Sequence, residues 1–311
     1  MLWLLLHAHK HAGAVYLARD ILSGQHVALK LEPIDSEHET LEHEFYVYRK
    51  LCGGVGIPQV HWFGTEYGFN ALAMDKLGQS LEALFIQCDF RFSVQTVLHL
   101  ACQLVRNHVY ILCSNTSSTN HVCHVQLHRL QYIHSRNFIH RDLKPSNIVM
   151  GIGKKASMVY LIDFGLSKQY RDTNTHLHIP CINGHGLTGT AVFTSIRSHL
   201  GWELGRRDDL ESLAYVLIYF LRGSLPWQSL GHQDIEGEDS VLKIKQQITP
   251  HDLCHGLPVE FSKFLEYTHL LSFDDKPDYN YLRSLFEDRF SQEGFDNLSF
   301  DWSSSDSEDC L

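Results

Sequence analysis

The spacing of apolar residues changes once along this chain, and that change limits the possible folds more than any other sequence feature. Between residues 15 and 74, short β-branched or apolar runs alternate with Gly, Asp and Ser, which is typical of strands, with one mixed stretch at 41–51. After Gly78, apolar residues recur three and four positions apart, which is typical of helices with one buried face. The sequence therefore predicts an α+β protein with a small, β-rich first lobe and a larger, α-helical second lobe.

Composition and charge exclude several classes of protein. The 311 residues are 44% hydrophobic and 20% charged, which is typical of a folded soluble protein with a sizeable core. Lys and Arg number 26 against 36 Asp and Glu, so the formal net charge of -10 argues against nucleic acid as a partner. The apolar run at 213–221 is about half as long as a membrane span, so no membrane-spanning segment is expected.

The cysteines and histidines indicate neither a disulfide framework nor a zinc site. The 8 cysteines are scattered from Cys52 to Cys310 without a CxxC pair, which favours reduced thiols in a cytoplasmic or nuclear protein. The densest cluster of potential zinc ligands lacks the two-pair spacing of a zinc site; it comprises Cys113, His121, Cys123 and His124.

Two short polar segments, each next to an apolar run, carry residues suited to phosphoryl transfer. The first is HRDLKPSN at 140–147, and the second is DFG at 163–165. In this order they match the catalytic-loop and metal-loop signatures of protein kinases. Either triplet alone is weak, because polar residues also occur simply to satisfy a turn, but the two together favour a kinase.

Each polar residue of these segments has a chemical role in such a reaction. A hydroxyl that attacks the γ-phosphoryl group of ATP needs a carboxylate to orient it and accept its proton, which makes Asp142 the candidate base. Lys144 would place positive charge beside the transferred group. Mg²⁺ prefers hard oxygen ligands, so Asn147 and Asp163 are the candidate metal ligands.

A lysine upstream fits a further role in ATP binding. Residues 27–30 read VALK, a strand that ends in Lys30. In a kinase such a lysine holds the α- and β-phosphates and is steadied by a glutamate on a helix, for which Glu44 is the candidate. Glu42 stays an alternative because only the phase of the helix separates the two, and a strand lysine is otherwise just a solvated side chain.

Over about residues 13–302, apart from one insertion, the chain resembles the casein kinase 1 family of serine/threonine protein kinases. That family replaces the usual APE motif of kinases with an SIN-like triplet, and Ser195, Ile196 and Arg197 occupy its place. The resemblance implies a bilobed protein-kinase fold with ATP between the lobes. It is carried by GGVGIP at 53–58, LGQSLEALF at 77–85, YIHSRNFIHRDLKPSNIVMG at 132–151, LIDFGLSKQYRD at 161–172, HIP at 178–180, LTGTA at 187–191, RRDDLESLAYVLIYFLRGSLPW at 206–227 and FDDKPDYNYLRSLF at 273–286.

The resemblance also implies which other residues serve the ATP site. Asp209, before the apolar stretch 210–221, resembles an aspartate that braces the catalytic loop; otherwise an acid there stabilises the helix through its dipole. Apolar residues implied around ATP are equally compatible with plain core. The set comprises Gly13 near the phosphates, Val15 and Ala28 above the adenine, Val149 or Ile162 below it, and Met74 to Leu77 as gatekeeper and hinge.

The phosphate-binding loop departs from the kinase pattern. Kinases cover the phosphates with a GxGxxG loop between the first two strands, where glycine lets the backbone approach the phosphates. Here Gly13 is the only glycine in the stretch 7–14, so we expect the first strand and most of this loop to be missing. Either a divergent chain binds ATP weakly, or the amino terminus is a wrong gene model.

A segment at 105–126 interrupts what should be one helix. Its SNTSSTN core has a loop composition, and removing it joins apolar residues at 97–104 and 127–133 into one helical stripe. A valine codon begins with GT and a glutamine codon can end in AG, so one hypothesis is a retained intron of 22 codons. The alternative is a surface loop extruded between helix halves, which costs little extra chain entropy.

The basic pocket with which the family reads acidic or phosphorylated substrates is altered. Val192 stands where the resemblance implies arginine, and Ile182 and His185 occupy other expected basic positions. The lysines expected after PWQ are replaced by GHQDIEGED at 231–239. We expect a weaker preference for acidic or phospho-primed sites.

The sequence thus predicts a kinase N-lobe at 1–76, a C-lobe at 77–302 and an acidic tail at 303–311. The expected activity is transfer of the ATP γ-phosphoryl group, with Mg²⁺, to Ser or Thr hydroxyls of protein substrates by a monomer in the cytoplasm or nucleus. Two alternatives stay open. A pseudokinase or scaffold would account for the altered loop and pocket, and a small-molecule phosphotransferase would share the catalytic pair but not the family-specific segments.

Overall fold

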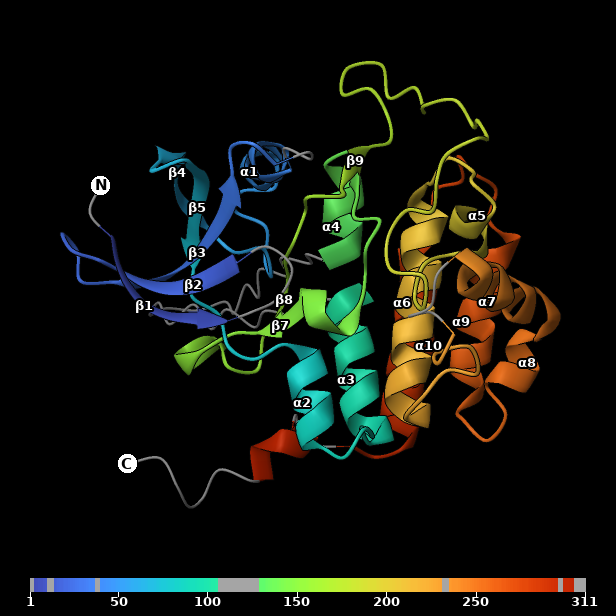
Figure 1. The fold of residues 1–311 in the computed structure, drawn as a ribbon. Helices are drawn as coiled ribbons and strands as arrows, with labels where there is room; N and C mark the ends of the chain where they lie inside the picture. Colours follow the sequence, from blue (N-terminus) through green and yellow to red (C-terminus); the bar gives the residue numbers. More distant parts are fainter. Residues whose placement is uncertain are drawn as a thin grey trace, which may run out of the picture.

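A five-stranded antiparallel sheet forms most of the first lobe, in the order β1-β2-β3-β5-β4 (Figure 1). The computed structural model describes residues 3–9, 14–36, 40–105, 129–230, 235–295 and 299–304. The expected α+β architecture with a β-rich first lobe and a helical second lobe is confirmed. The strands of the sheet are β1 (Trp3–His9), β2 (Ala14–Asp20), β3 (His26–Pro33), β4 (Val60–Glu66) and β5 (Phe69–Asp75).

The expectation that the first strand is missing was wrong. Residues 3–9 form β1, which pairs with β2 in antiparallel register, with an irregularity between Leu5 and His7. Strand pairing uses main-chain groups, so the mainly apolar sequence WLLLHAH can supply this strand without the glycine motif that usually follows it. Residues 10–13, which include Gly13, lie outside the described residues.

One helix, α1 (Leu41–Lys50), packs on the sheet. Its ring of Phe45 stacks on Phe63 of β4, with centroids 4.7 Å apart. Glu32 at the end of β3 fixes the start of the helix, because its carboxylate accepts hydrogen bonds from the N–H groups of Thr40 and Leu41. The inward face of α1 carries the buried residues Leu41, Glu44, Val47 and Tyr48.

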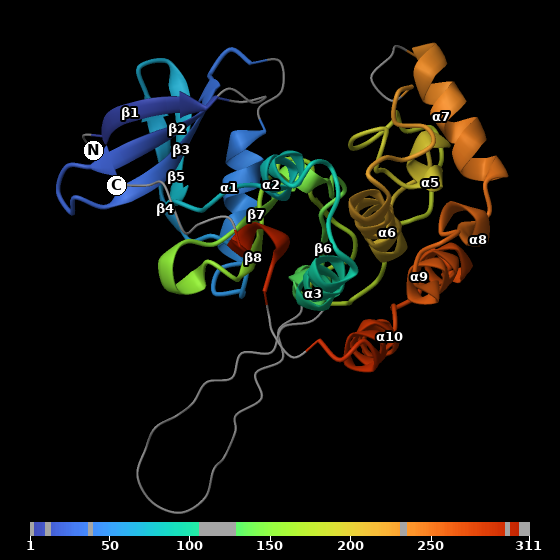
Figure 2. The same ribbon diagram turned by 90° about the horizontal axis from the view of Figure 1, so that it is seen from below.

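The second lobe is built around α6, which packs against both α3 and α9. Residues 208–221 of α6 are all buried, which explains why that stretch reads as almost continuously apolar. Figure 2 shows the later helices gathered on the side of the molecule away from the sheet. The helices are α2 (Leu81–Gln87), α3 (Val94–Val105), α4 (Arg129–Ser135), α5 (Ile196–His199), α6 (Arg206–Arg222), α7 (Ile235–Gln247), α8 (Pro250–Leu253), α9 (Val259–Leu270) and α10 (Tyr279–Gln292).

Short elements connect the two lobes and form the floor between them. The link after β5 is fastened to β7, because Gly78 N–H donates to Met150 O at 2.8 Å and Met150 N–H donates to Gln79 O at 2.9 Å. Within the part of the chain that the structure describes, none of the helices has the length and apolar character that a membrane crossing requires. The short elements are β6 (Phe138–Ile139), β7 (Ile148–Met150), β8 (Val159–Leu161), β9 (Lys168–Gln169) and the 3-10 turns Pro145–Asn147, Gly153–Lys155 and Asp301–Ser304.

The helix that the insertion interrupts is present as two helices, α3 and α4, which contact each other. Apart from Val105, the segment 105–126 lies outside the described residues. Arg129 at the start of α4 is fully buried and binds the end of α3 through Gln103 O at 2.6 Å, and β8 through Val159 O at 2.9 Å. Buried contacts therefore join α4 to α3 and β8, although the insertion separates the two helices in the sequence.

The end of the chain returns to the start of α3. Asp301 accepts hydrogen bonds from Ser93 N–H at 2.7 Å and from the Ser93 hydroxyl at 2.6 Å. The ring of Phe300 stacks on His99, with centroids 4.5 Å apart. Residues 303 and 304 of the predicted acidic tail belong to the last 3-10 turn, and residues 305–311 lie outside the described part of the chain.

The GGVGIP loop offers a matched test of packing. Gly53 and Gly56 both have positive φ, at 82° and 76°. A Cβ on Gly53 would meet nothing within 4 Å, whereas one on Gly56 would lie 2.5 Å from Arg129 Nε and 2.7 Å from Val159 O. We expect Gly53→Ala to lose about 1–2 kcal/mol of unfolding free energy from backbone strain. Gly56→Ala should lose about 1–3 kcal/mol more from overpacking, measured by urea unfolding. Equal losses would show that the close approach carries no weight.

Candidate active site

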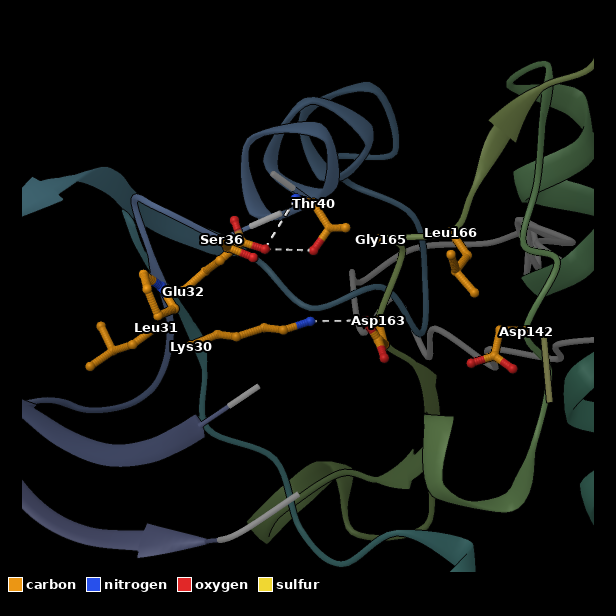
Figure 3. A pocket seen from close by; sticks show the side chains of 10 residues that line it. Lys30, Leu31, Glu32, Ser36, Thr40, Asp142, Asp163, Gly165 and Leu166 are labelled. Carbon is orange, nitrogen blue, oxygen red and sulfur yellow. Dashed lines mark hydrogen bonds and ion pairs between the residues drawn. The ribbon is translucent and has the colours of Figure 1, made fainter. Parts of the chain in front are cut away.

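A partly buried ion cluster joins the two lobes. Lys30 on β3 places Nζ 2.7 Å from Glu44 Oε2 on α1. The same Nζ lies 2.9 Å from Asp163 Oδ1, after β8 (Figure 3). The choice between the two glutamates falls on Glu44, which is 1% exposed, whereas Glu42 lies on the exposed side of α1. Sequence spacing had left the phase of this helix open.

The charges of this cluster support one another. Burial disfavours the ammonium of Lys30, but Glu44 and Asp163 outweigh burial and raise its pKa above the ordinary lysine value. Burial likewise acts to raise the pKa of Asp163, and Lys30 outweighs it, so that this pKa is lowered. Burial raises the pKa of Glu44, an effect that Lys30 opposes. Lys30 is therefore held as a cation between the lobes.

The backbone around Asp163 is fixed to α1. Asp163 has φ of 65°, in the left-handed region that a residue with a Cβ rarely adopts, and its N–H donates to the hydroxyl of Tyr48 at 3.2 Å. The next N–H, of Phe164, donates to Glu44 Oε1 at 3.3 Å. The Phe164 ring is fully buried and lies edge-on to Tyr48, with centroids 5.0 Å apart. The position of the metal-loop segment thus depends on α1.

The catalytic-loop residues form a second polar group, on the side of the second lobe. Asp142 is 8% exposed, and its Oδ2 lies 2.7 Å from Lys144 Nζ. Asn147 donates its amide to Asp142 O at 2.9 Å and to Oδ2 at 3.2 Å. The other oxygen, Oδ1, accepts the Thr190 N–H at 3.0 Å and the Thr190 hydroxyl at 2.8 Å. The hydroxyl of Thr190 is therefore hydrogen-bonded to Asp142, the candidate base.

Asp209 at the start of α6 braces this loop from below. It is 2% exposed, and its oxygens accept the N–H groups of His140 and Arg141, each at 2.8 Å, and Nε2–H of His134 at 2.8 Å. Arg141 has φ of 69°, so the loop is held in a strained turn at this point. Burial acts to raise the pKa of Asp209. His134, His140 and the Arg141 N–H outweigh this effect, so the pKa of Asp209 is lowered. The bracing contacts agree with the role that the resemblance implied.

The residues expected around adenine share one face of the sheet. Val15 pairs with Lys30 across β2 and β3, and Ala28 pairs with Met74 across β3 and β5. Directly opposed residues point to the same side, and Ala28 lies two positions from Lys30, so all four face alike. Leu77 follows in the link between the lobes and is half-buried. Two residues of the opposite lobe complete the predicted set, Val149 on buried β7 and Ile162 next to Asp163.

An open hollow of about 400 Å³ lies beside Lys30, Asp163 and Asp142, and none of the residues expected around adenine is among the described residues that line it. Its walls carry Lys30 and Glu32 from the first lobe and Asp142, Asp163 and Leu166 from the second (Figure 3). Cationic, acidic and apolar groups thus converge on one solvent-accessible space, which is typical of a binding site.

The triplet at 195–197 anchors the segment that follows the hollow. Ser195 donates its hydroxyl to Asp208 Oδ1 at 2.7 Å, and Ile196 N–H donates to Glu211 Oε1 at 2.8 Å. Arg197 Nη1 lies 3.3 Å from Glu211 Oε2. Burial acts to raise the pKa of Glu211, but hydrogen bonds and the cations outweigh it and lower it. Buried carboxylates of α6 therefore hold this segment at three points.

The positions at which the resemblance implied basic residues carry little positive charge among the described residues. Val192 is 2% exposed and belongs to the main core, so it presents nothing to a substrate. Glu203 lies 2.7 Å from Lys168 Nζ and 3.3 Å from His185 Nε2, and so offsets the charge of the lysine. Ile182 is 50% exposed. Residues 231–234 of the GHQDIEGED stretch lie outside the described part of the chain.

Sequence reasoning missed three contributors to the site. Thr190 belongs to the segment LTGTA, but the sequence does not identify it as the partner of Asp142, because the two residues are 48 positions apart. Tyr48 follows Glu44 by one helical turn, a spacing that places it on the same helix face. The ring of His134 lies in YIH, ahead of the catalytic loop, and binds Asp209. Only the helical spacing of Tyr48 was a usable signal.

No group of three or more His, Cys, Asp or Glu side chains suited to a metal ion occurs in the ranges that the structure describes. Residues 106–128, which hold the cluster around His121 and Cys123, lie outside them. A magnesium site of the kind expected from Asn147 and Asp163 has two protein ligands and needs no such group.

Comparison with known families agrees with this geometry. A family model described as protein kinase domain matches residues 11–268, which is most of the chain. The match spans both lobes and includes all of the polar residues of the site described above.

A double-mutant cycle tests the ion cluster. Lys30→Met leaves the buried carboxylate of Glu44 without its cation, and Glu44→Gln removes the charge with little change in volume. We expect the two changes to be coupled by about 0.5–3 kcal/mol in unfolding free energy, measured by urea unfolding of both single variants and the double variant. Glu42→Gln is the matched control and should show no coupling to Lys30→Met. Coupling as large for Glu42 would contradict the assignment.

Proposed function

Because the chain belongs to the protein kinase domain family, we propose that it is an active serine/threonine protein kinase of the casein kinase 1 type. It would transfer the γ-phosphoryl group of ATP to Ser or Thr hydroxyls of proteins. The observation that supports this most is Lys30, whose Nζ bonds both Glu44 and Asp163 and so joins the two lobes across one hollow. The serine/threonine and casein kinase 1 assignments rest on the sequence segments that resemble that family.

The residues present suit ATP with Mg²⁺. Asp163 binds Lys30 through Oδ1, and its side chain is 39% exposed, so the carboxylate also faces the hollow. Asn147 donates its amide N–H to Asp142 and has a carbonyl oxygen, a hard donor, in the same group. Asp163 and Asn147 would hold the metal, which when bound neutralises charge on the β- and γ-phosphates. Lys30 would bind the α- and β-phosphates.

The chemical step follows from the catalytic-loop geometry. Asp142 Oδ1 accepts a hydroxyl hydrogen bond in this structure, from Thr190, which shows that this oxygen can orient a hydroxyl. A substrate hydroxyl that hydrogen-bonds this carboxylate attacks the γ-phosphorus and passes its proton to Asp142 as the new O–P bond forms. The bond from the γ-phosphorus to the oxygen that bridges it to the β-phosphate breaks, and ADP leaves. Lys144, 2.7 Å from Asp142, supplies positive charge beside the transferred group.

The altered basic pocket supports a substrate preference. Val192 lies in the core, and Lys168 is paired with Glu203, so little positive charge is free to bind an acidic side chain. We therefore extend the proposal to proteins whose acceptor site needs no nearby phosphate or acidic cluster.

Phosphoryl transfer by the full chain tests the function directly. With Mg²⁺, radiolabelled ATP and a serine/threonine peptide library, we expect incorporation that Asp142→Asn lowers by about 10²–10⁴-fold through loss of the base. Asp89→Asn, at an exposed turn residue, is the matched control and should keep full activity. A chain that binds ADP and Mg²⁺ by calorimetry but transfers no phosphate would be a binding or scaffold protein instead.

The same library measures the preference. We expect acceptor sites with neutral residues upstream to be phosphorylated at least as well as those with aspartate, glutamate or phosphoserine, because Val192 is buried and Lys168 is paired with Glu203, which leaves little positive charge to bind an anion there. A profile still dominated by acidic residues upstream of the acceptor would refute this part of the proposal.

A further inference from the structure

The core-facing side of α7 carries a lysine where a helix of this kind would carry an apolar residue. Val241 and Lys245 lie four positions apart and are the buried residues of the described side chains of α7. Lys245 is 2% exposed, and it is the only buried lysine in the described part of the chain. Burying an amine is costly unless its N–H groups find acceptors, so this side chain must have specific partners.

The partners of Lys245 are backbone carbonyls of the segment that meets the catalytic base. Its Nζ donates to Ala191 O at 2.9 Å and to Thr194 O at 2.6 Å. The two carbonyls lie one and four positions after Thr190, whose N–H and hydroxyl bind Asp142. A single side chain on α7 thus connects to the catalytic aspartate through one short stretch of backbone.

The surroundings of the amine complete its binding site. Nζ lies 4.8 Å from the ring centroid of Tyr215 and 5.3 Å from that of Trp227, distances suited to cation–π attraction. His199 Nε2 lies 3.3 Å away. Trp227 also donates its indole N–H to Val192 O at 2.8 Å. Carbonyls 191, 192 and 194 are therefore all held by donors of the second lobe.

We propose that Lys245 is a positioning residue for phosphoryl transfer, which fixes the segment 190–194 and thereby sets the affinity for the protein substrate. The proposal rests on the proposed kinase function. Thr190 binds the base in this structure and is partly exposed, so a substrate hydroxyl must enter beside it, and the buried residues 191–194 support Thr190 from below. If that backbone moves, the site for the substrate moves, while the ATP-binding groups Lys30 and Asp163 stay in place.

Kinetics of the full chain separate this role from a merely structural one. Lys245→Met keeps the apolar stem and removes both hydrogen bonds, so the peptide KM should rise at least about tenfold while the ATP KM changes less than about twofold. Lys243→Met changes an exposed lysine of the same helix and should alter neither constant. A purely structural effect would instead lower the active fraction and kcat with both KM values unchanged, and that result would overturn the proposal.

Hydrogen exchange tests the same point without any need for catalysis. In Lys245→Met, exchange should accelerate by about tenfold or more in peptides that contain the amides of Thr190, Phe193 and Thr194, and stay unchanged in peptides from α6. Should the wild-type chain transfer no phosphate, the proposed function fails but this measurement still decides whether Lys245 fixes the segment. If Lys245→Met does not fold, Lys245→Gln takes its place, and unchanged exchange in that variant overturns the proposal.

The protonation of Lys245 gives an independent signature. Burial lowers its pKa to about 7, opposed by Glu211, and the other titratable groups that face it are His199 and Tyr215. Since the unfolded chain keeps the ordinary lysine value of 10.5, it holds more protons between these pH values, and wild-type stability rises with pH there. Lys245→Met removes this rise. The urea concentration at the unfolding midpoint of the wild type should therefore increase, relative to that of Lys245→Met, between pH 7 and 10. The neutral amine keeps two N–H groups, enough for both carbonyls.

Discussion

The buried carboxylate of Asp209 is the interaction on which the geometry of the catalytic loop depends. A carboxylate removed from water is stable only where hydrogen-bond donors replace its hydration, and Asp209 has two backbone N–H groups and the ring of His134. Because two of those donors belong to consecutive residues, the carboxylate fixes the strained backbone at Arg141 and so the direction of Asp142. The buried helix α6 thus carries, in its first turn, the charge that orders the catalytic loop.

Two further buried polar side chains hold the main chain in a similar way. Glu211, two residues along the same helix, binds the N–H of Ile196, and Lys245 binds carbonyls of the preceding segment. Carboxylates therefore hold amide groups and an amine holds carbonyl groups on either side of one loop. These contacts bind main-chain atoms of residues 191, 194 and 196, so they do not depend on the side chains at those positions.

The sequence predicted the architecture because the change in apolar spacing reflects burial on one face of a sheet and then on one face of each helix. It also predicted which polar residues meet at the site, because Lys30, Asp142 and Asp163 belong to signature segments of protein kinases. It misjudged β1, because strand pairing depends on backbone groups that no motif reports. It left Glu42 and Glu44 unresolved, because helix phase follows from packing of Tyr48 and Val47 against the core. It gave no sign of Lys245, whose acceptors are carbonyls more than fifty positions away.

The carboxylate of Glu32 has a consequence for how the molecule moves. β3 grips α1 twice, through Glu32 at its first residues and through Lys30 one turn later at Glu44. A helix that is bound at two points along its length cannot turn about either one, so β3 and α1 form one rigid unit of the first lobe. Because Tyr48 and Glu44 of that helix also bind the main chain of Asp163 and Phe164, β3, α1 and the metal-loop segment are positioned together.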